Sequence, residues 1–235
     1  MKTRIEIPMY VTEGFAKGLE KDFPEAASNY GEIINVRNQA TQFLKDTGNM
    51  IRKVEEVRKA NVADPTQTEQ AKAVNTWDYA TKKAEEIEKR FEKLPDINST
   101  ISKITDDIEA TLKQGADSSF GREARARIAS MPEAERSKFL AEVVQKGDLQ
   151  TARYVLGAPS FFSGIPDAIH SKIKDQYKST VFPEEMQAVK ALQSLKTHLD
   201  KGYKATQQTF RDIHAHASKN GALDKSEKAQ KLMNE

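Results

Sequence analysis

Apolar side chains recur along much of this chain at alternating intervals of four and three residues, the spacing of a helix that buries one narrow face. The clearest case lies between Val36 and Val57. Its apolar positions are Val36, Ala40, Phe43, Thr47, Met50, Val54 and Val57. Such a heptad pattern indicates a coiled-coil-like helix that packs against a partner helix. The pattern is the same whether that partner comes from the same chain or from another.

Two further helices are expected directly after this one. Pro65 and Pro95 separate the periodic segments, and Asp64 and Asp96 are suited to cap the helices that follow. The apolar positions are Val74, Trp77, Ala80, Ala84, Ile87, Phe91 and Leu94 in the second helix, and Ile97, Ile101, Ile104, Ile108 and Leu112 in the third. Because short connections make successive helices antiparallel, residues 31–115 are predicted to form an antiparallel three-helix, coiled-coil-like bundle.

The pattern changes after residues 114–121, a polar stretch with two glycines that marks a domain boundary. Residues 120–180 show short apolar stripes between glycines and prolines, which predict a compact helical domain. A long periodic segment from 183 to 218 predicts one long helix, and residues 183–235 are assigned to that helix and a polar tail. Residues 1–30 are assigned to an N-terminal arm and a short helix.

The expected fold class is therefore all-α: an elongated antiparallel helical bundle, a smaller helical domain and a long C-terminal helix. Composition agrees with thin apolar faces, because only 37% of residues are hydrophobic and 31% are charged. No apolar run approaches the roughly 18 residues that span a bilayer, so no membrane association is expected. We expect the protein in the cytoplasm or in a virus particle assembled there.

Charge and motifs exclude several classes of function. The formal net charge is only +2, and Glu123 interrupts the arginines at 122, 125 and 127, so no nucleic-acid partner is expected. Cysteine is absent, which removes thiol nucleophiles and thiolate metal sites. Phosphate-binding glycine motifs and a serine nucleophile elbow are also missing. The sequence thus predicts a protein that is not an enzyme.

One metal hypothesis rests on helical carboxylate and histidine pairs. Metal sites inside helical bundles use two acid-x-x-His pairs and two further carboxylates. The chain offers one such pair, Asp167 with His170, and a looser pair of Asp212 with His216. One match of two does not predict a metal, and no cofactor is expected. A helical metal enzyme stays only as a third hypothesis.

The loop at residues 158–164 is the most apolar in the chain, and it contains Phe161 and Phe162 side by side. Two adjacent phenylalanines do not both fit one helix face. Two interpretations are open: the rings cover the end of the small helical domain, or they form an exposed anchor for a partner.

Residues 147–164, with the sequence GDLQTARYVLGAPSFFSG, resemble a segment of poorly characterised helical proteins encoded by bacteriophages and prophages. The resemblance implies a place in a phage particle or in its assembly, and it implies no activity.

Our first hypothesis for the function is therefore a non-enzymatic structural or assembly protein that associates with itself, as a homo-oligomer, or with other particle proteins. The alternative is a soluble adaptor that binds a host or phage protein through the helical hairpin and loop at residues 139–164. The expected partner-binding residues are Phe161, Phe162, Val36, Phe43, Met50, Val54 and Val57.

Overall fold

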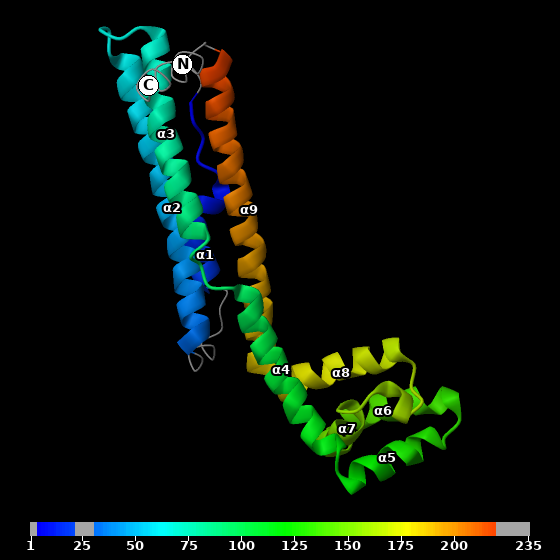
Figure 1. Ribbon diagram of the computed structural model, residues 1–235. Helices are drawn as coiled ribbons and strands as arrows, with labels where there is room; N and C mark the ends of the chain where they lie inside the picture. The colour runs from blue at the N-terminus through cyan, green and yellow to red at the C-terminus, as the bar shows by residue number, and fades with distance from the viewer. Residues whose placement is uncertain (1–3, 22–30, 220–235) are drawn as a thin grey trace, which may run out of the picture. The chain divides into compact units, whose positions relative to one another are not determined.

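The computed structural model describes residues 4–21 and 31–219, and these residues are almost entirely helical (Figure 1). The described part contains nine α-helices and two short 3-10 helices, and no strand. The elements are η1 (Met9–Val11), α1 (Glu13–Lys21), α2 (Gly31–Ala63), α3 (Glu69–Phe91), α4 (Ile97–Ala116), α5 (Ser119–Ala129), α6 (Glu133–Gln145), α7 (Leu149–Leu156), η3 (Ser160–Phe162), α8 (Asp167–Val181) and α9 (Pro183–Lys219). The all-α prediction is confirmed. The predicted polar tail, residues 220–235, lies outside the described residues.

The described residues divide into two compact units. Unit 1 contains residues 4–21, 31–96 and 192–219, and unit 2 contains residues 97–191. Helix α4 therefore belongs to unit 2, although its periodicity predicted the third helix of a bundle over residues 31–115. Its apolar face packs against α7, and α5 also contacts it. Periodicity identifies the face that a helix buries and leaves open which element covers it.

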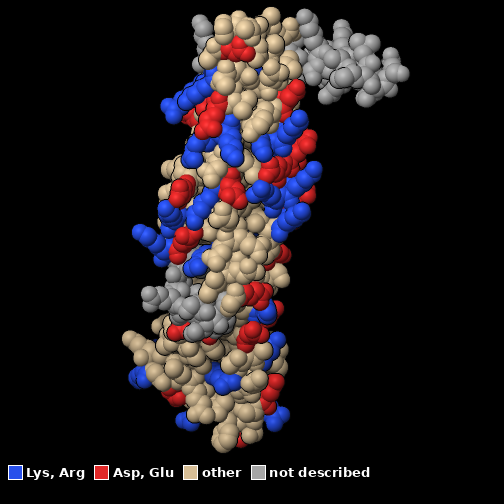
Figure 2. Space-filling model, turned by 90° about the vertical axis from the view of Figure 1, so that its left-hand side faces the viewer, with Lys and Arg blue, Asp and Glu red and all other residues tan. Residues whose placement is uncertain are grey.

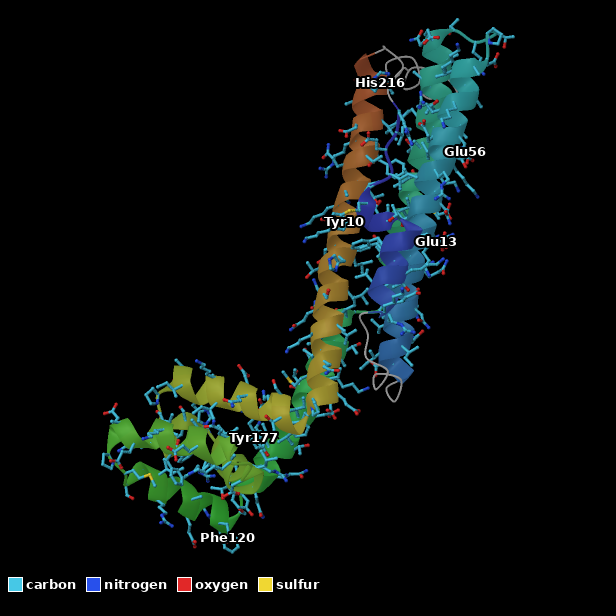
Figure 3. The ribbon with its side chains drawn as sticks, turned by 180° about the vertical axis from the view of Figure 1, so that it is seen from behind. Tyr10, Glu13, Glu56, Phe120, Tyr177 and His216 are labelled. Atoms are coloured by element: carbon cyan, nitrogen blue, oxygen red, sulfur yellow. The ribbon has the colours of Figure 1, made fainter. Side chains whose placement is uncertain are left out.

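In unit 1, α3 runs back along α2, as the short connection between them predicted (Figure 1). Helix α1 packs against α2, and Phe15 of α1 contacts the ring of His198 in α9, with 5.2 Å between the ring centroids. Tyr10 also lies between α9 and the α1–α2 pair (Figure 3). The core of unit 1 is thus closed by four helices and the arm that precedes α1.

The arm is joined to α2 by a hydrogen bond to Glu55, and glycines at 48 and 202 allow close approaches around it. The amide of Ile5 donates to Oε2 of Glu55 (3.1 Å), and Nε of Arg58 donates to the same oxygen (2.6 Å). Further along, Val11 is fully buried. A Cβ on Gly48 would overlap the carbonyl oxygen of Val11, and a Cβ on Gly202 would lie 2.9 Å from Cδ2 of Leu44. At position 48 only glycine lets the backbone of the arm approach α2 this closely.

Unit 2 packs α4 to α8 around a separate core. Its largest fully buried side chains include Leu112, Ile128, Leu140 and Leu156. The carboxylate of Glu109 on α4 joins α8 by ion pairs to Lys174 (2.7 Å) and Lys178 (2.6 Å). Among the helices of residues 4–21 and 31–219, none combines the length and apolar character needed to cross a membrane.

Candidate functional site

The most exposed apolar side chains of unit 2 include the two phenylalanines of η3. Phe161 is 70% exposed and Phe162 is 53% exposed. Their ring centroids lie 4.1 Å apart at an interplanar angle of 36°, so the rings form one continuous apolar surface. We call Phe161 and Phe162 the phenylalanine pair. Neither ring is buried in the core of unit 2, and a role of the exposed rings as an anchor for a partner stays a prediction.

Hydrogen bonds fix the loop that carries the pair. Pro159 precedes the 3-10 helix, and the hydroxyl of the fully buried Ser163 donates to the carbonyl of Ser160 (2.9 Å). The hydroxyl of Ser160 in turn donates to the carboxylate of Asp167 at the start of α8. Nη1 of Arg136 donates to the carbonyl of Gly164 on the other side of the loop (3.1 Å). The loop that carries the pair is therefore held in one conformation by its own hydrogen bonds and by Arg136.

The buried side chain of Arg125 contacts the phenylalanine pair. Its guanidinium carbon lies 5.8 Å from the ring centroid of Phe162, within the range of a cation–π contact. Nη1 donates to the carbonyl of Ala116 (2.8 Å) and to the carbonyl of Tyr154 (2.7 Å). Burial lowers the pKa of Arg125 from its ordinary value, and the nearby charge of Arg122 acts in the same direction, whereas Asp117 opposes both. One buried arginine thus joins the ends of α4 and α7 to the exposed surface.

Other apolar side chains are exposed on the same unit. Phe120 is 68% exposed, and it projects from the start of α5 in Figure 3. Ile169 on α8 is 41% exposed and Phe139 on α6 is 37% exposed. In Figure 2, unit 2, at the bottom of the view, shows fewer charged side chains than unit 1, where both signs alternate. Unit 2 therefore carries less charge than unit 1 on the face shown in Figure 2.

The structure places the other predicted partner-binding residues elsewhere. Val36, Phe43, Met50 and Val54 are buried within unit 1, and Val57 is half-buried. Ala40 and Thr47 of the same heptad face are also buried. The heptad face of α2 is thus covered by elements of its own chain except at the half-buried Val57, and the exposed members of the predicted site residues are Phe161 and Phe162.

The metal hypothesis gains no geometric support. In residues 4–21 and 31–219, no group of three or more histidine, aspartate and glutamate side chains lies close enough to hold a metal ion. His170 is only 6% exposed, and its Nε2 has no hydrogen-bond partner within the described part of the chain. Burial lowers the pKa of His170, and a hydrogen bond to the backbone of Val155 opposes this shift. His170 is thus a core residue, and the carboxylate of Asp167 accepts a hydrogen bond from Ser160 of η3.

Sequence reasoning missed Phe120 and the supporting role of Arg125. Phe120 stands in a polar stretch that was assigned to a boundary, and no periodicity marked it as surface or core. Arg125 was considered only as a member of a basic cluster. The sequence feature that could have identified the role of Arg125 is its position. An arginine one turn before the end of a short helix is well placed to donate to carbonyl groups at the ends of neighbouring helices.

Comparison with known proteins returned no matching family model, no matching curated protein and no matching solved structure. The function therefore has to be argued from the geometry of this chain.

Proposed function

We propose that this chain is a non-enzymatic structural or assembly protein that binds another protein through the phenylalanine pair. The observation that carries the proposal is the exposure of two adjacent phenylalanine rings, 70% and 53%, on a loop that is fixed by hydrogen bonds. Burying a phenylalanine side chain fully is worth about 1.5 to 3 kcal/mol. The fold of unit 2 leaves most of that free energy unused, so it is available to binding.

The wider character of the chain agrees with this proposal. The helices carry surface charge of both signs, and no group of potential metal ligands lies close together among the described residues. These features suit a scaffold that presents a binding surface. The resemblance of residues 147–164 to helical phage proteins covers the phenylalanine pair itself. It favours a partner that belongs to a virus particle or to its assembly.

A tagged form of the full chain tests the proposal in the cells that naturally produce it. Proteins that co-purify with wild type are identified by mass spectrometry and compared with those retained by the double variant Phe161→Ser, Phe162→Ser. Both rings are exposed, so the variant should fold, and circular dichroism checks that it does. Phe120→Ser is the matched control, because it removes an equally exposed ring from the same unit.

We expect wild type and Phe120→Ser to retain the same partner and the double variant to lose it by about thirtyfold or more, the effect of removing an aromatic hot spot. Full retention of every partner by a folded double variant would overturn the proposal. The adaptor hypothesis uses the same loop, and it would be favoured if the partner is a host protein and not a particle component.

A further inference from the structure

The ring of His170 is enclosed in unit 2 at the start of α8. A hydrogen bond joins the ring to the backbone of Val155 on α7. Nε2 has no hydrogen-bond partner among residues 4–21 and 31–219, so Nδ1 makes the bond to Val155. This arrangement suits the neutral ring, which carries one N–H. The protonated ring would bury a positive charge and a second donor that has no acceptor.

Burial and nearby charges favour the neutral form of this ring. Burial is the largest cause and lowers the pKa of His170, whereas the hydrogen bond to Val155 raises it. Lys174 on the same helix lowers this pKa further, and the carboxylates of Asp167 and Glu109 raise it by smaller amounts. Both carboxylates have other partners, which are a hydroxyl of η3 for Asp167 and two lysines of α8 for Glu109. Neither carboxylate accepts from the ring.

The other elements packed against α8 are α6, α7 and η3, and their charged groups are exposed or bonded elsewhere. The 3-10 helix η3 has no charged residue. Arg153 of α7 donates to the carbonyl of Thr111 (Nε, 3.0 Å), and Arg136 of α6 donates to the carbonyl of Gly164. On α6, Glu133, Glu135 and Lys138 are exposed and Glu142 pairs with Lys146; on α7, the hydroxyl of Tyr154 accepts from Gln150.

The first turn of α8 joins this buried ring to the loop of the phenylalanine pair. Asp167 accepts a hydrogen bond from the hydroxyl of Ser160 in η3, and the amide of His170 donates to the carbonyl of Pro166 (2.9 Å). Of residues 167–170, only His170 is buried. Water therefore reaches a protonated ring only when this turn moves outward. Such a movement separates Asp167 from Ser160.

We propose that protonation of His170 opens the first turn of α8 and loosens the η3 loop, so that the phenylalanine pair holds its partner at neutral pH and releases it in mild acid. The inference rests on the proposed function, because it names the regulation of the same binding surface. A loosened loop presents the two rings in many arrangements, and ordering them on binding then costs free energy. Histidine is the side chain that titrates in this range of pH.

Hydrogen exchange followed by NMR measures the opening without any partner. The reporter amides are those of Ser163, Gly164 and His170, which donate to carbonyls of η3 and of Pro166. After correction for the intrinsic pH dependence of exchange, their protection should fall by up to about tenfold between about pH 6.5 and pH 5.5, because the open turn binds one more proton than the closed turn. A low concentration of urea speeds exchange through global unfolding and should leave this fall unchanged.

His170→Asn is the variant that removes the proton-binding ring. Asparagine keeps an N–H donor near the position of Nδ1 and does not titrate, so the protection of the reporter amides should no longer depend on pH. His214→Asn is the matched control, because it removes an exposed histidine of α9, and it should behave as wild type. Protection that is constant in wild type, that falls equally in His170→Asn, or that falls only through urea-sensitive exchange would overturn the inference.

The effect on binding is measured in the co-purification experiment, with a wash at about pH 7.5 or about pH 5.5. Wild type and His214→Asn should lose the partner in the acid wash, and His170→Asn should keep it. Equal retention by wild type in both washes would overturn the inference and leave the proposed function standing. The proposed function fails separately, if a folded Phe161→Ser, Phe162→Ser variant keeps every partner at neutral pH.

Discussion

Replacing Gly48 by alanine tests how the N-terminal arm is held against α2. The new Cβ would overlap the carbonyl oxygen of Val11 and lie 3.1 Å from its carbonyl carbon. Both are backbone atoms, so the arm has to move and the fully buried Val11 side chain loses its packing. The lost packing of Val11 destabilises the fold by about 2 to 3 kcal/mol, whereas the higher helix propensity of alanine stabilises it by about 1 kcal/mol. We expect a net loss of about 1 to 2 kcal/mol.

The assay is urea unfolding followed by tryptophan fluorescence, because Trp77 in unit 1 is the only tryptophan of the chain. Gly18→Ala is the control: Gly18 is exposed in α1, and a Cβ there meets no atom within 4 Å. It should stabilise unit 1 by about 0.5 to 1 kcal/mol. An unfolding midpoint of Gly48→Ala at or above that of wild type would refute the account of the arm.

Three further predictions concern unit 2. The pKa of His170 is lowered in the folded chain. When the pH falls below the ordinary histidine pKa of 6.5, the unfolded chain therefore binds a proton more readily than the folded chain does. The stability of unit 2 should therefore be full above about pH 6.5 and decline as pH falls below it; hydrogen exchange of the α8 amides measures this decline, and His170→Leu should flatten it. Burial raises the pKa of Glu109, but hydrogen bonds from Lys174 and Lys178 outweigh burial and lower the pKa overall. The contribution of Glu109 to the stability of unit 2 is therefore present above about pH 4.5 and is lost as pH falls through the lowered pKa. Glu109→Gln should cost about 1 to 2 kcal/mol in thermal unfolding at neutral pH, and a variant as stable as wild type would contradict the role of this ion pair. Arg125→Met leaves two backbone carbonyls without their donor and should cost about 2 kcal/mol or more, measured by chemical unfolding followed by circular dichroism; an unchanged midpoint would show that solvent satisfies both carbonyls.

Periodicity predicted the helices well. The bounds of α9, Pro183–Lys219, follow the periodic segment from 183 to 218, and α3 pairs with α2 as expected. The assignment of α4 to unit 2 was not predictable in this way. An apolar stripe such as that of Ile104, Ile108 and Leu112 fits equally well against any complementary helix, and the choice of α7 depends on contacts between residues far apart in the sequence.

The candidate site was predictable only in part. Two adjacent phenylalanines in a loop were recognised from the sequence, but their exposure depends on how Arg125, Ser163 and Asp167 shape the loop in three dimensions. The partial exposure of Trp77 and Ala84 was also not predictable. Both occupy apolar heptad positions, and a heptad pattern does not reveal that the surrounding helices leave those positions partly uncovered.

The phenylalanine pair is the proposed surface for a protein partner. Photo-crosslinking of the full chain in the cells that naturally produce it is the sharpest test of this proposal, with benzoylphenylalanine in place of Phe161 and, as the control, in place of Phe120. We expect a crosslink from position 161 to a protein that co-purifies with wild type, identified by mass spectrometry, and no crosslink to that protein from position 120. Crosslinks confined to unit 2 of the same copy, or none to any protein, would contradict it.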